Sequence, residues 1–283
     1  SVLPTARACF SMDYDSSRNE VVIFGGLNED EEVLNETWSW DGSEWEKKQP
    51  DHSPPSRSHH IMVFDSDRGV MVMYGGVNSK TDTWEWDGTD WCEIETENNP
   101  GERLACAMTY DAARRNVVLF GGYGCDIEDT WIYDGEDWHY MMPPDGLDPP
   151  NRFQHCMAYD SNRGITIVYG GYSKQDTWEW DGEFWHQIET LHNPGSACED
   201  AMAYDPVRRK TVLYGAGGLP GGYETWEYDG MDWTQCYPPG WQKPGTYQGH
   251  RMIYHPVRNS IIIFGGALDK QFPGGYIAND NMK

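Results

Sequence analysis

Short apolar runs alternate with polar turns along this chain, and the same succession recurs about every 45 to 50 residues. The most apolar run of each unit is unbroken and largely β-branched, as in Val21–Phe24. Such a run indicates a strand that is covered on both faces. A double glycine such as Gly25-Gly26 ends the run in five of the six units, and Gly215-Ala216 stands there in the fifth. Glycine at this point predicts positive φ angles or a close backbone approach.

A second strand is predicted just before each of these runs. It carries a Met and, two residues later, an aromatic residue, so the two side chains share one face. The methionines are Met12, Met62, Met108, Met157, Met202 and Met252. An Asp and, three residues on, an Arg follow in five units, as in Asp15 and Arg18, and His255 replaces the Asp in the sixth. This pair predicts a tight hairpin in which the Asp accepts turn amides and the Arg neutralises it.

Thirteen of the fourteen tryptophans lie in one nine-residue phrase that occurs five times, starting at Thr37, Thr83, Thr130, Thr177 and Thr225. Its first half, Thr-Trp-x-aromatic, predicts a third strand, the Asp-Gly pair predicts a hairpin turn, and the final Trp opens a fourth strand. Four antiparallel strands per unit correspond to one blade of a β-propeller, in which each unit needs its neighbours to bury its apolar faces.

An aliphatic run, a double glycine, a variable loop and paired aromatics at fixed spacing resemble the kelch repeat. The doubled Trp departs from the usual Tyr and single downstream Trp, and indicates a Trp-rich subgroup. The resemblance covers nearly the whole chain and implies an all-β, six-bladed propeller with four antiparallel strands per blade. Proteins with kelch repeats include scaffolds, ligand receptors and a few enzymes. We expect one domain, 1–283, with blades at about 4–53, 54–99, 100–148, 149–193, 194–243 and 244–283.

The last unit is shorter than the others. After Gly265-Gly266 only residues 267–283 remain, without an Asp-Gly pair or a second Trp, so the last blade is predicted to be incomplete. Either the polypeptide continues beyond Lys283, or residues 276–282 form a third strand and the ring closes loosely. Kelch propellers are often joined to other domains and this chain starts at Ser1 without a Met, so we expect it to be part of a longer multidomain chain.

The composition of the chain limits the classes of partner that it can bind. With 46 acidic and 21 basic residues the net charge is −25, which argues against binding to nucleic acid or to anionic lipid surfaces. No apolar run approaches the roughly 20 residues of a membrane helix, so no membrane insertion is predicted. The cysteine count of seven forbids a fully paired set of disulfides, and Cys9, Cys106 and Cys156 are expected as reduced thiols. No catalytic, phosphate-binding or zinc-type motif occurs, so no cofactor and no catalytic residue is predicted.

The connections after the second strand and those between blades vary in length, and alternating strand direction puts both on one face, the predicted binding face. Here an Arg opens the first strand of four units, at Arg7, Arg57, Arg103 and Arg152, with Ala197 and Tyr247 in the other two. These guanidinium groups suit an anionic ligand. Acids at Glu36, Asp82, Asp129, Asp176 and Glu224 precede each phrase on the same face, so intramolecular pairing is the favoured alternative.

Aromatic residues also occur in these loops, at Tyr123, Phe153, Tyr172, Tyr223, Trp241, Phe272 and Tyr276. They can stack on a sugar or clasp a peptide, or they can simply pack the loops. Phe153, Tyr172 and Tyr247 join the four arginines as the predicted ligand-binding residues.

Three histidines, His60, His155 and His250, occupy one repeat position in alternate units, where Phe10, Cys106 and Asp200 stand in the others. A three-fold set invites a metal site, but inner-strand side chains of a propeller point between blades, so no metal is predicted. His59 and His60 face opposite ways and cannot chelate one ion together. The acidic loop 28–32 lacks the pattern of a dedicated calcium loop and is expected to be solvated.

Two functions follow. The favoured one is a recognition module whose variable-loop face binds a protein segment or a glycan. The alternative is an enzyme that acts on a sugar or peptide at the channel mouth, with metal assistance in one version. It requires His60, His155 or His250 to converge with acids near a common point.

Overall fold

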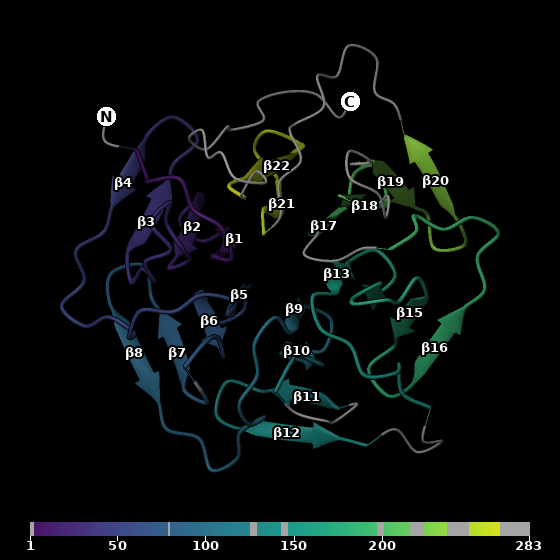
Figure 1. The fold of residues 1–283 in the computed structure, drawn as a ribbon, viewed down its shortest axis with the longest axis horizontal. Coiled ribbons are helices and arrows are strands. Elements are labelled where there is room, and N and C mark those ends of the chain that lie inside the picture. Colours follow the sequence, from purple (N-terminus) through teal and green to yellow (C-terminus); the bar gives the residue numbers. More distant parts are fainter. Residues whose placement is uncertain are drawn as a thin grey trace.

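The computed structural model describes residues 3–78, 80–124, 129–142, 147–196, 201–215, 224–236 and 249–266. Within these ranges, six antiparallel sheets surround a central axis, as in a β-propeller (Figure 1). The first consists of β1 (Ser11–Asp15), β2 (Glu20–Phe24), β3 (Thr37–Trp40) and β4 (Trp45–Lys47). The sixth has two strands in the described residues, β21 (Arg251–His255) and β22 (Ser260–Phe264). The predicted propeller is confirmed, and in the described part of the chain the sixth blade is incomplete, as expected.

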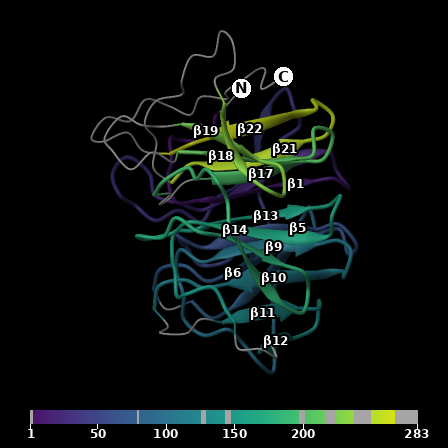
Figure 2. The same ribbon diagram turned by 90° about the vertical axis from the view of Figure 1, so that its right-hand side faces the viewer.

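The four sheets between these two repeat the same order. They comprise β5 (Ile61–Asp65), β6 (Val70–Tyr74), β7 (Thr83–Trp86), β8 (Trp91–Ile94), β9 (Ala107–Asp111), β10 (Asn116–Phe120), β11 (Thr130–Tyr133), β12 (Trp138–Met141), β13 (Cys156–Asp160), β14 (Ile165–Tyr169), β15 (Thr177–Trp180), β16 (Trp185–Ile188), β17 (Ala201–Asp205), β18 (Lys210–Tyr214), β19 (Thr225–Tyr228) and β20 (Trp233–Cys236). The first strand of each sheet lies nearest the axis and the fourth lies at the rim (Figure 1). Seen edge-on, the strands run between two faces of the ring (Figure 2).

The predicted hairpin between the first two strands is confirmed. In the first blade Asp15 Oδ1 accepts the backbone N–H groups of Ser17 and Arg18 at 2.9 and 3.0 Å, and the Arg18 guanidinium lies 2.6 Å from Asp15 Oδ2. The face with these hairpins is called the hairpin face below, and the opposite face is called the loop face.

The double glycines are explained by close approach as well as by φ. Gly25 and Gly26 have φ angles of 63° and 97°. A Cβ on Gly25 would lie 2.5 Å from the Arg57 carbonyl oxygen and 3.0 Å from Cε1 of His60. Only glycine therefore lets the second strand of one blade meet the first strand of the next.

Neighbouring blades are joined by one hydrogen bond that recurs at the same repeat position. In the second to the fifth blade, the last Trp of the phrase donates its indole N–H to the first Thr of the phrase in the preceding blade. The pairs are Trp91 to Thr37, Trp138 to Thr83 and Trp185 to Thr130 at 2.8 Å, and Trp233 to Thr177 at 2.9 Å. We call this bond the Trp–Thr pin. It explains why both ends of the phrase recur.

The inner strands close the ring between the sixth and first blades. The backbone N–H of Cys9 donates to Gly249 at 3.1 Å, and that of Gly266 donates to Arg7 at 3.0 Å. Ile262 and Phe264 of β22 share a buried cluster with Phe10, Met12 and Trp45 of the first blade. The third strand expected at 276–282 lies outside the described residues. No helix of the described part is long and apolar enough to cross a membrane.

Candidate functional site

The four predicted arginines lie at the loop face with buried side chains. Each guanidinium pairs with the acid that precedes the phrase of its own blade: Arg7 with Glu36 at 2.8 Å, Arg57 with Asp82 at 2.7 Å, Arg103 with Asp129 at 3.0 Å and Arg152 with Asp176 at 2.8 Å. Each also donates to the carbonyl of the first glycine of the double-glycine position, at 3.0 to 3.3 Å. The intramolecular pairing favoured by the sequence is present. A ligand would have to break it to reach these groups.

The acids of these pairs are further held by tryptophan. The first indole of the phrase donates to the same carboxylate, for example Trp84 to Asp82 at 2.6 Å. Burial by itself would raise the pKa of Asp82, but the Arg57 guanidinium and the Trp84 indole outweigh it and leave that pKa below its usual value. The same balance, with Lys47, Arg7 and Trp38 as donors, lowers the pKa of Glu36 to about 2. Asp82 and Glu36 are therefore ionised at neutral pH and held in place by these donors.

The three repeated histidines lie between sheets and do not converge. The rings of His60, His155 and His250 pack edge-on against Phe24, Phe120 and Tyr214 at 5.6, 5.6 and 5.5 Å. Burial and the charge of Arg152 lower the pKa of His155 to about 3, and burial also holds the pKa of His60 well below its ordinary value. Among the described residues, no group of three or more His, Cys, Asp or Glu side chains is placed to hold a metal ion.

The predicted aromatic residues Phe153 and Tyr172 do meet. Their rings stack at a centroid distance of 5.1 Å and an interplanar angle of 14°, and Tyr123 meets Phe153 edge-on at 5.4 Å. Tyr123 and Tyr172 remain 59% and 61% exposed. We call these three residues the aromatic cluster. It presents flat apolar surface to solvent on the loop face.

Backbone hydrogen bonds fix the loops that carry the aromatic cluster. Tyr123 exchanges two backbone hydrogen bonds with Leu104, at 2.8 and 3.0 Å, and the N–H of Tyr172 donates to Phe153 at 3.0 Å. Two loops that follow a second strand are thus tied to the blade connections beside them. The cluster is preorganised rather than formed by mobile side chains on a free loop.

Four backbone hydrogen bonds link neighbouring blades at the mouth of the axial channel. Gln154 donates to Ala105, Ala105 to His59, His59 to Cys9 and Cys9 to Gly249, at 2.8, 2.9, 2.9 and 3.1 Å. All five residues have positive φ angles, between 53° and 70°. A non-glycine residue in this conformation costs about 1 kcal/mol or more, which these hydrogen bonds offset. We call these five residues the collar; the aromatic cluster adjoins it because Phe153 precedes Gln154.

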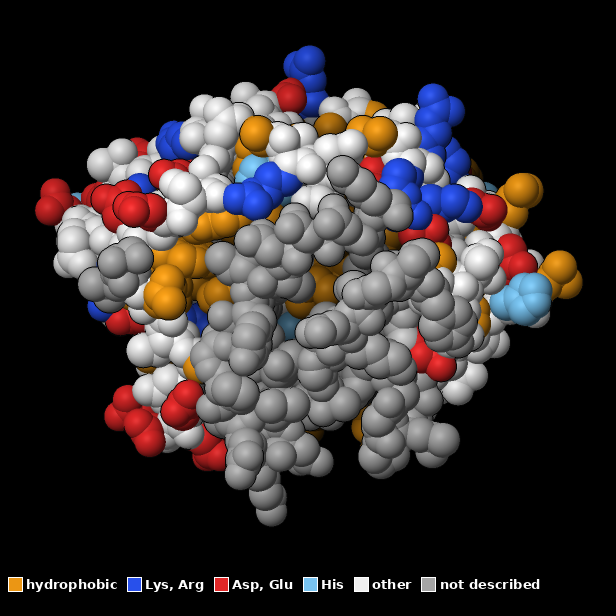
Figure 3. Space-filling model, turned by 90° about the horizontal axis from the view of Figure 1, so that it is seen from above, with side chains coloured by type: hydrophobic (Ala, Val, Ile, Leu, Met, Phe, Trp, Pro, Cys, Tyr) orange, Lys and Arg blue, Asp and Glu red, His pale blue; other side chains and the backbone are white. Residues whose placement is uncertain are grey.

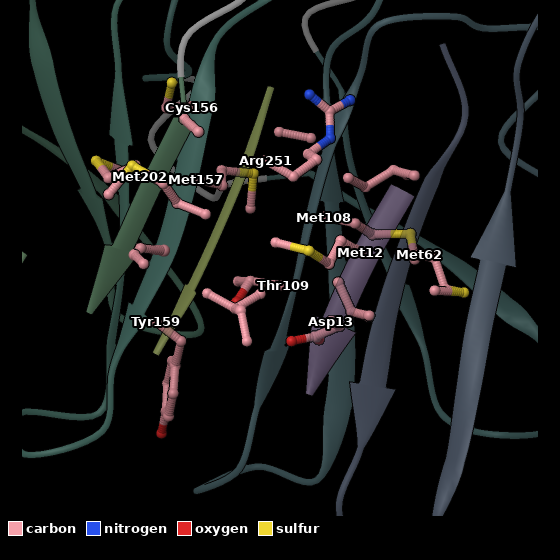
Figure 4. Close-up of a pocket in the computed structure, with 18 of the residues that line it drawn as sticks. Met12, Asp13, Met62, Met108, Thr109, Cys156, Met157, Tyr159, Met202 and Arg251 are labelled. Carbon is pink, nitrogen blue, oxygen red and sulfur yellow. The ribbon is translucent and has the colours of Figure 1, made fainter. Parts of the chain in front are cut away.

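Below the collar the first strands enclose a cavity of about 490 Å³. Sulfur-containing side chains make up much of its wall, including Met12, Met108 and Cys156 (Figure 4). Two charged side chains reach it, Arg251 at the start of β21 and Asp13 in the middle of β1. Burial raises the pKa of Asp13 to about 6, although the carboxylate accepts the Phe64 backbone N–H at 2.7 Å. The wall is otherwise mainly apolar, so the cavity suits a small, largely uncharged group.

Some of the remaining residues that were singled out in the sequence lie outside the described part of the chain, and others lie within it. Tyr247, Tyr223, Trp241, Phe272, Tyr276, Asp200 and Ala197 lie outside the described residues. The acidic loop folds on itself, since the Asn28 side chain accepts the N–H groups of Asp30 and Glu32 at 3.0 and 2.8 Å. Cys106 and Cys156 are buried, as expected, and Cys9 is partly exposed.

Sequence reasoning missed the channel residues Asp13 and Arg251. An alignment of the six units would have indicated both residues, because each is the one charged residue at its repeat position. The other units have Val63, Thr109, Ala158, Ala203 and Ile253 in place of Asp13, and Ser11, Ile61, Ala107, Cys156 and Ala201 in place of Arg251.

Comparison with solved structures supports the architecture. The chain is similar to the structure of YjhT, with a TM-score of 0.71 and 11% sequence identity over 94% of this chain and 92% of that one. At this identity the likeness establishes the fold alone. No protein-family model matches the chain, and no curated protein matches it.

Proposed function

We propose that this propeller is of the kelch type and is a recognition module whose loop face binds a neutral glycan, with the aromatic cluster as its platform. The observation that carries the proposal is the exposed, preorganised stack of Phe153 and Tyr172 beside the channel mouth. Exposed aromatic rings held in place by backbone bonds supply contact area at little cost in conformational entropy.

A pyranose ring matches this surface better than an extended peptide does. One face of the sugar presents C–H groups that can lie flat on an aromatic ring, while its hydroxyl edges need polar partners. Such partners are available in the channel, because Gln154, His59 and Arg251 line its cavity and Gln154 directly follows Phe153 in the chain. The net charge of −25 disfavours polyanionic glycans by repulsion, so a neutral one is expected.

The catalytic alternative gains no support from a specific observation. It needs a histidine near acids at a common point, whereas the three histidines lie between sheets against aromatic rings. We therefore propose recognition without covalent chemistry as the function of the loop face.

The test is an array of neutral and charged glycans and of peptides, followed by calorimetry on the selected ligand. Phe153→Ala and Tyr172→Ala should each weaken binding about tenfold, because stacking area of this kind contributes about 1 to 1.5 kcal/mol. Tyr140→Ala is the matched control, since Tyr140 is also an exposed tyrosine whose ring packs against a Trp, 5.6 Å from Trp131 and tilted by 53°, but it lies on the outer strand β12.

Equal losses in Tyr140→Ala and Tyr172→Ala, or no loss in either cluster variant, would overturn the proposal. Selection of an extended peptide with the same dependence on Phe153 and Tyr172, and of no glycan, would replace the glycan by a protein segment.

A further inference from the structure

Among the described residues, Asp13 is the one acidic side chain that lines the axial cavity. It is half-buried, whereas the residues on both sides of it in β1 are buried. Its carboxylate points into the channel, among side chains that are mostly apolar (Figure 4). The cavity therefore contains one negative charge at a defined height along the axis.

The hydrogen bonds of Asp13 hold its carboxylate in place without neutralising it. Oδ1 accepts the backbone N–H of Tyr14 and Oδ2 accepts that of Phe64, both at 2.7 Å. A carboxylate has about four acceptor positions, so each oxygen can accept one bond more. No Lys, Arg or His in the described part of the chain forms an ion pair with Asp13. Its pKa of about 6 leaves most of the group ionised at neutral pH.

A single carboxylate suits an organic cation better than a divalent metal ion. Calcium takes roughly six to eight oxygen ligands, and no set of His, Cys, Asp or Glu in the described residues is placed to hold a metal ion. The net charge of −25 raises the local concentration of small cations. Acidic side chains gather at several places on the surface seen in Figure 3.

The rest of the cavity suits the uncharged body of such a ligand. Its volume of about 490 Å³ lies within the usual range for small-molecule sites, about 300 to 1,000 Å³. Methionines such as Met12, Met108 and Met202 supply a polarisable wall that adapts to the shape of a ligand.

Arg251 gives the cavity a direction. It occupies the repeat position of Ser11, two residues closer to the collar than Asp13, which is about 7 Å along a strand. Its positive charge disfavours a cation at the collar end and favours one beside Asp13. The lining also includes Ser66 and Pro206 of the first hairpins, so the hairpin face offers an entry that does not pass Arg251.

We propose that the channel binds a small monoamine, with its ammonium group on Asp13 and its apolar body against the methionine wall. The ammonium donates to the two acceptor positions that the backbone leaves open. This site is separate from the aromatic cluster, so it does not depend on glycan binding at the loop face.

The experiment is calorimetric titration of the whole chain with butylamine, hexylamine and 2-phenylethylamine, each beside the alcohol of the same carbon skeleton. At least one amine should bind saturably, with one site per chain, and should bind about tenfold more tightly than its alcohol. The difference corresponds to one charge-assisted hydrogen bond to a carboxylate.

Two variants place the ligand in the channel. Asp13→Asn should weaken amine binding about tenfold and leave the binding of the alcohol unchanged, because only the charge is removed. Thr109→Phe should abolish the binding of both, since Thr109 lines the cavity at the repeat position of Asp13 and a phenyl ring there fills the channel. Glu183→Gln is the control for net charge: Glu183 is exposed in an Asp-Gly turn, and its loss should change neither affinity.

The comparison of amine with alcohol needs no variant, so it decides the matter even if Asp13→Asn fails to fold. Absence of saturable amine binding, or equal affinity for amine and alcohol, overturns the proposal. So does amine binding that survives Thr109→Phe, or that Glu183→Gln weakens as much as Asp13→Asn does.

Discussion

Two sets of side chains share the loop face and differ in almost every respect. The arginines at positions 7, 57, 103 and 152 recur in register, are buried and are paired with acids of their own blades. The aromatic cluster of Tyr123, Phe153 and Tyr172 is partly exposed and lies at the boundary of the third and fourth blades. In this chain the recurring residues serve the fold of each unit, and the residues that depart from the repeat are the ones that we propose for binding.

The arginine set should give the largest effect on stability. Arg103→Met leaves the Asp129 carboxylate buried without its ion-pair partner, since the two side chains are 0% and 1% exposed. We expect a loss of about 3 to 5 kcal/mol in the free energy of unfolding, measured with denaturant. Arg115→Met is the control: Arg115 is 77% exposed and pairs with Asp67 at the surface, so its loss should cost less than about 1 kcal/mol. Equal costs would contradict the structural role of the buried pair.

The buried histidine His155 should have the next largest effect on stability, and this effect should appear only at acidic pH. The folded-state pKa of His155 is about 3 and the unfolded value about 6.5, so the unfolded chain binds the extra proton as the pH falls below 6.5. This one residue should remove about 2 kcal/mol of stability between pH 7.5 and pH 5. His155→Phe, which copies the residue at position 10, should flatten the profile there by that amount. An unchanged acid slope in this variant would mean that the histidine is not buried in its neutral form.

Removal of one Trp–Thr pin should have the third largest effect, a loss of about 1 kcal/mol in the free energy of unfolding. Thr83→Val removes the acceptor of the Trp138 indole and leaves a buried donor, whereas Thr225→Val removes a hydroxyl that has no partner in the described part of the chain. Thermal unfolding should therefore show a lower midpoint for the first variant and an unchanged or higher midpoint for the second. A loss of the same size in both would show that Thr225 is bonded in the folded protein.

The aromatic cluster should give the smallest effect on stability. Tyr172 is 61% exposed, so Tyr172→Ala should change the free energy of unfolding by less than about 0.5 kcal/mol. Denaturant unfolding checks this value beside the Arg103 variant. A cost of more than about 2 kcal/mol would assign the cluster to the scaffold.

Much of the fold was predictable because its determinants are local. The unbroken run Val21–Phe24, the Asp15 and Arg18 hairpin and the Asp-Gly turns each act within a few residues, and the structure confirms all of them. The Trp–Thr pins were not predicted, although both ends of the phrase were noticed. They join residues that are 54 to 56 positions apart, and this pairing depends on how blades pack side by side.

The site was predictable only in part. Phe153 and Tyr172 were selected as loop aromatics, but sequence alone does not say that their rings stack. The collar was not predicted, because Cys9, His59 and Gln154 adopt positive φ angles although none of them is glycine. Nothing in their side chains signals that conformation; the hydrogen bonds between blades impose it.

The most direct test of the central claim, that recognition belongs to the unrepeated part of the loop face, is hydrogen–deuterium exchange with and without the glycan selected on the array. The account predicts slower exchange at the amides of Leu104, Tyr123 and Tyr172, which hold the aromatic cluster, and unchanged exchange at the hairpin-face amides of Ser17 and Arg18. Protection confined to the hairpin face, with none around the cluster, would contradict it.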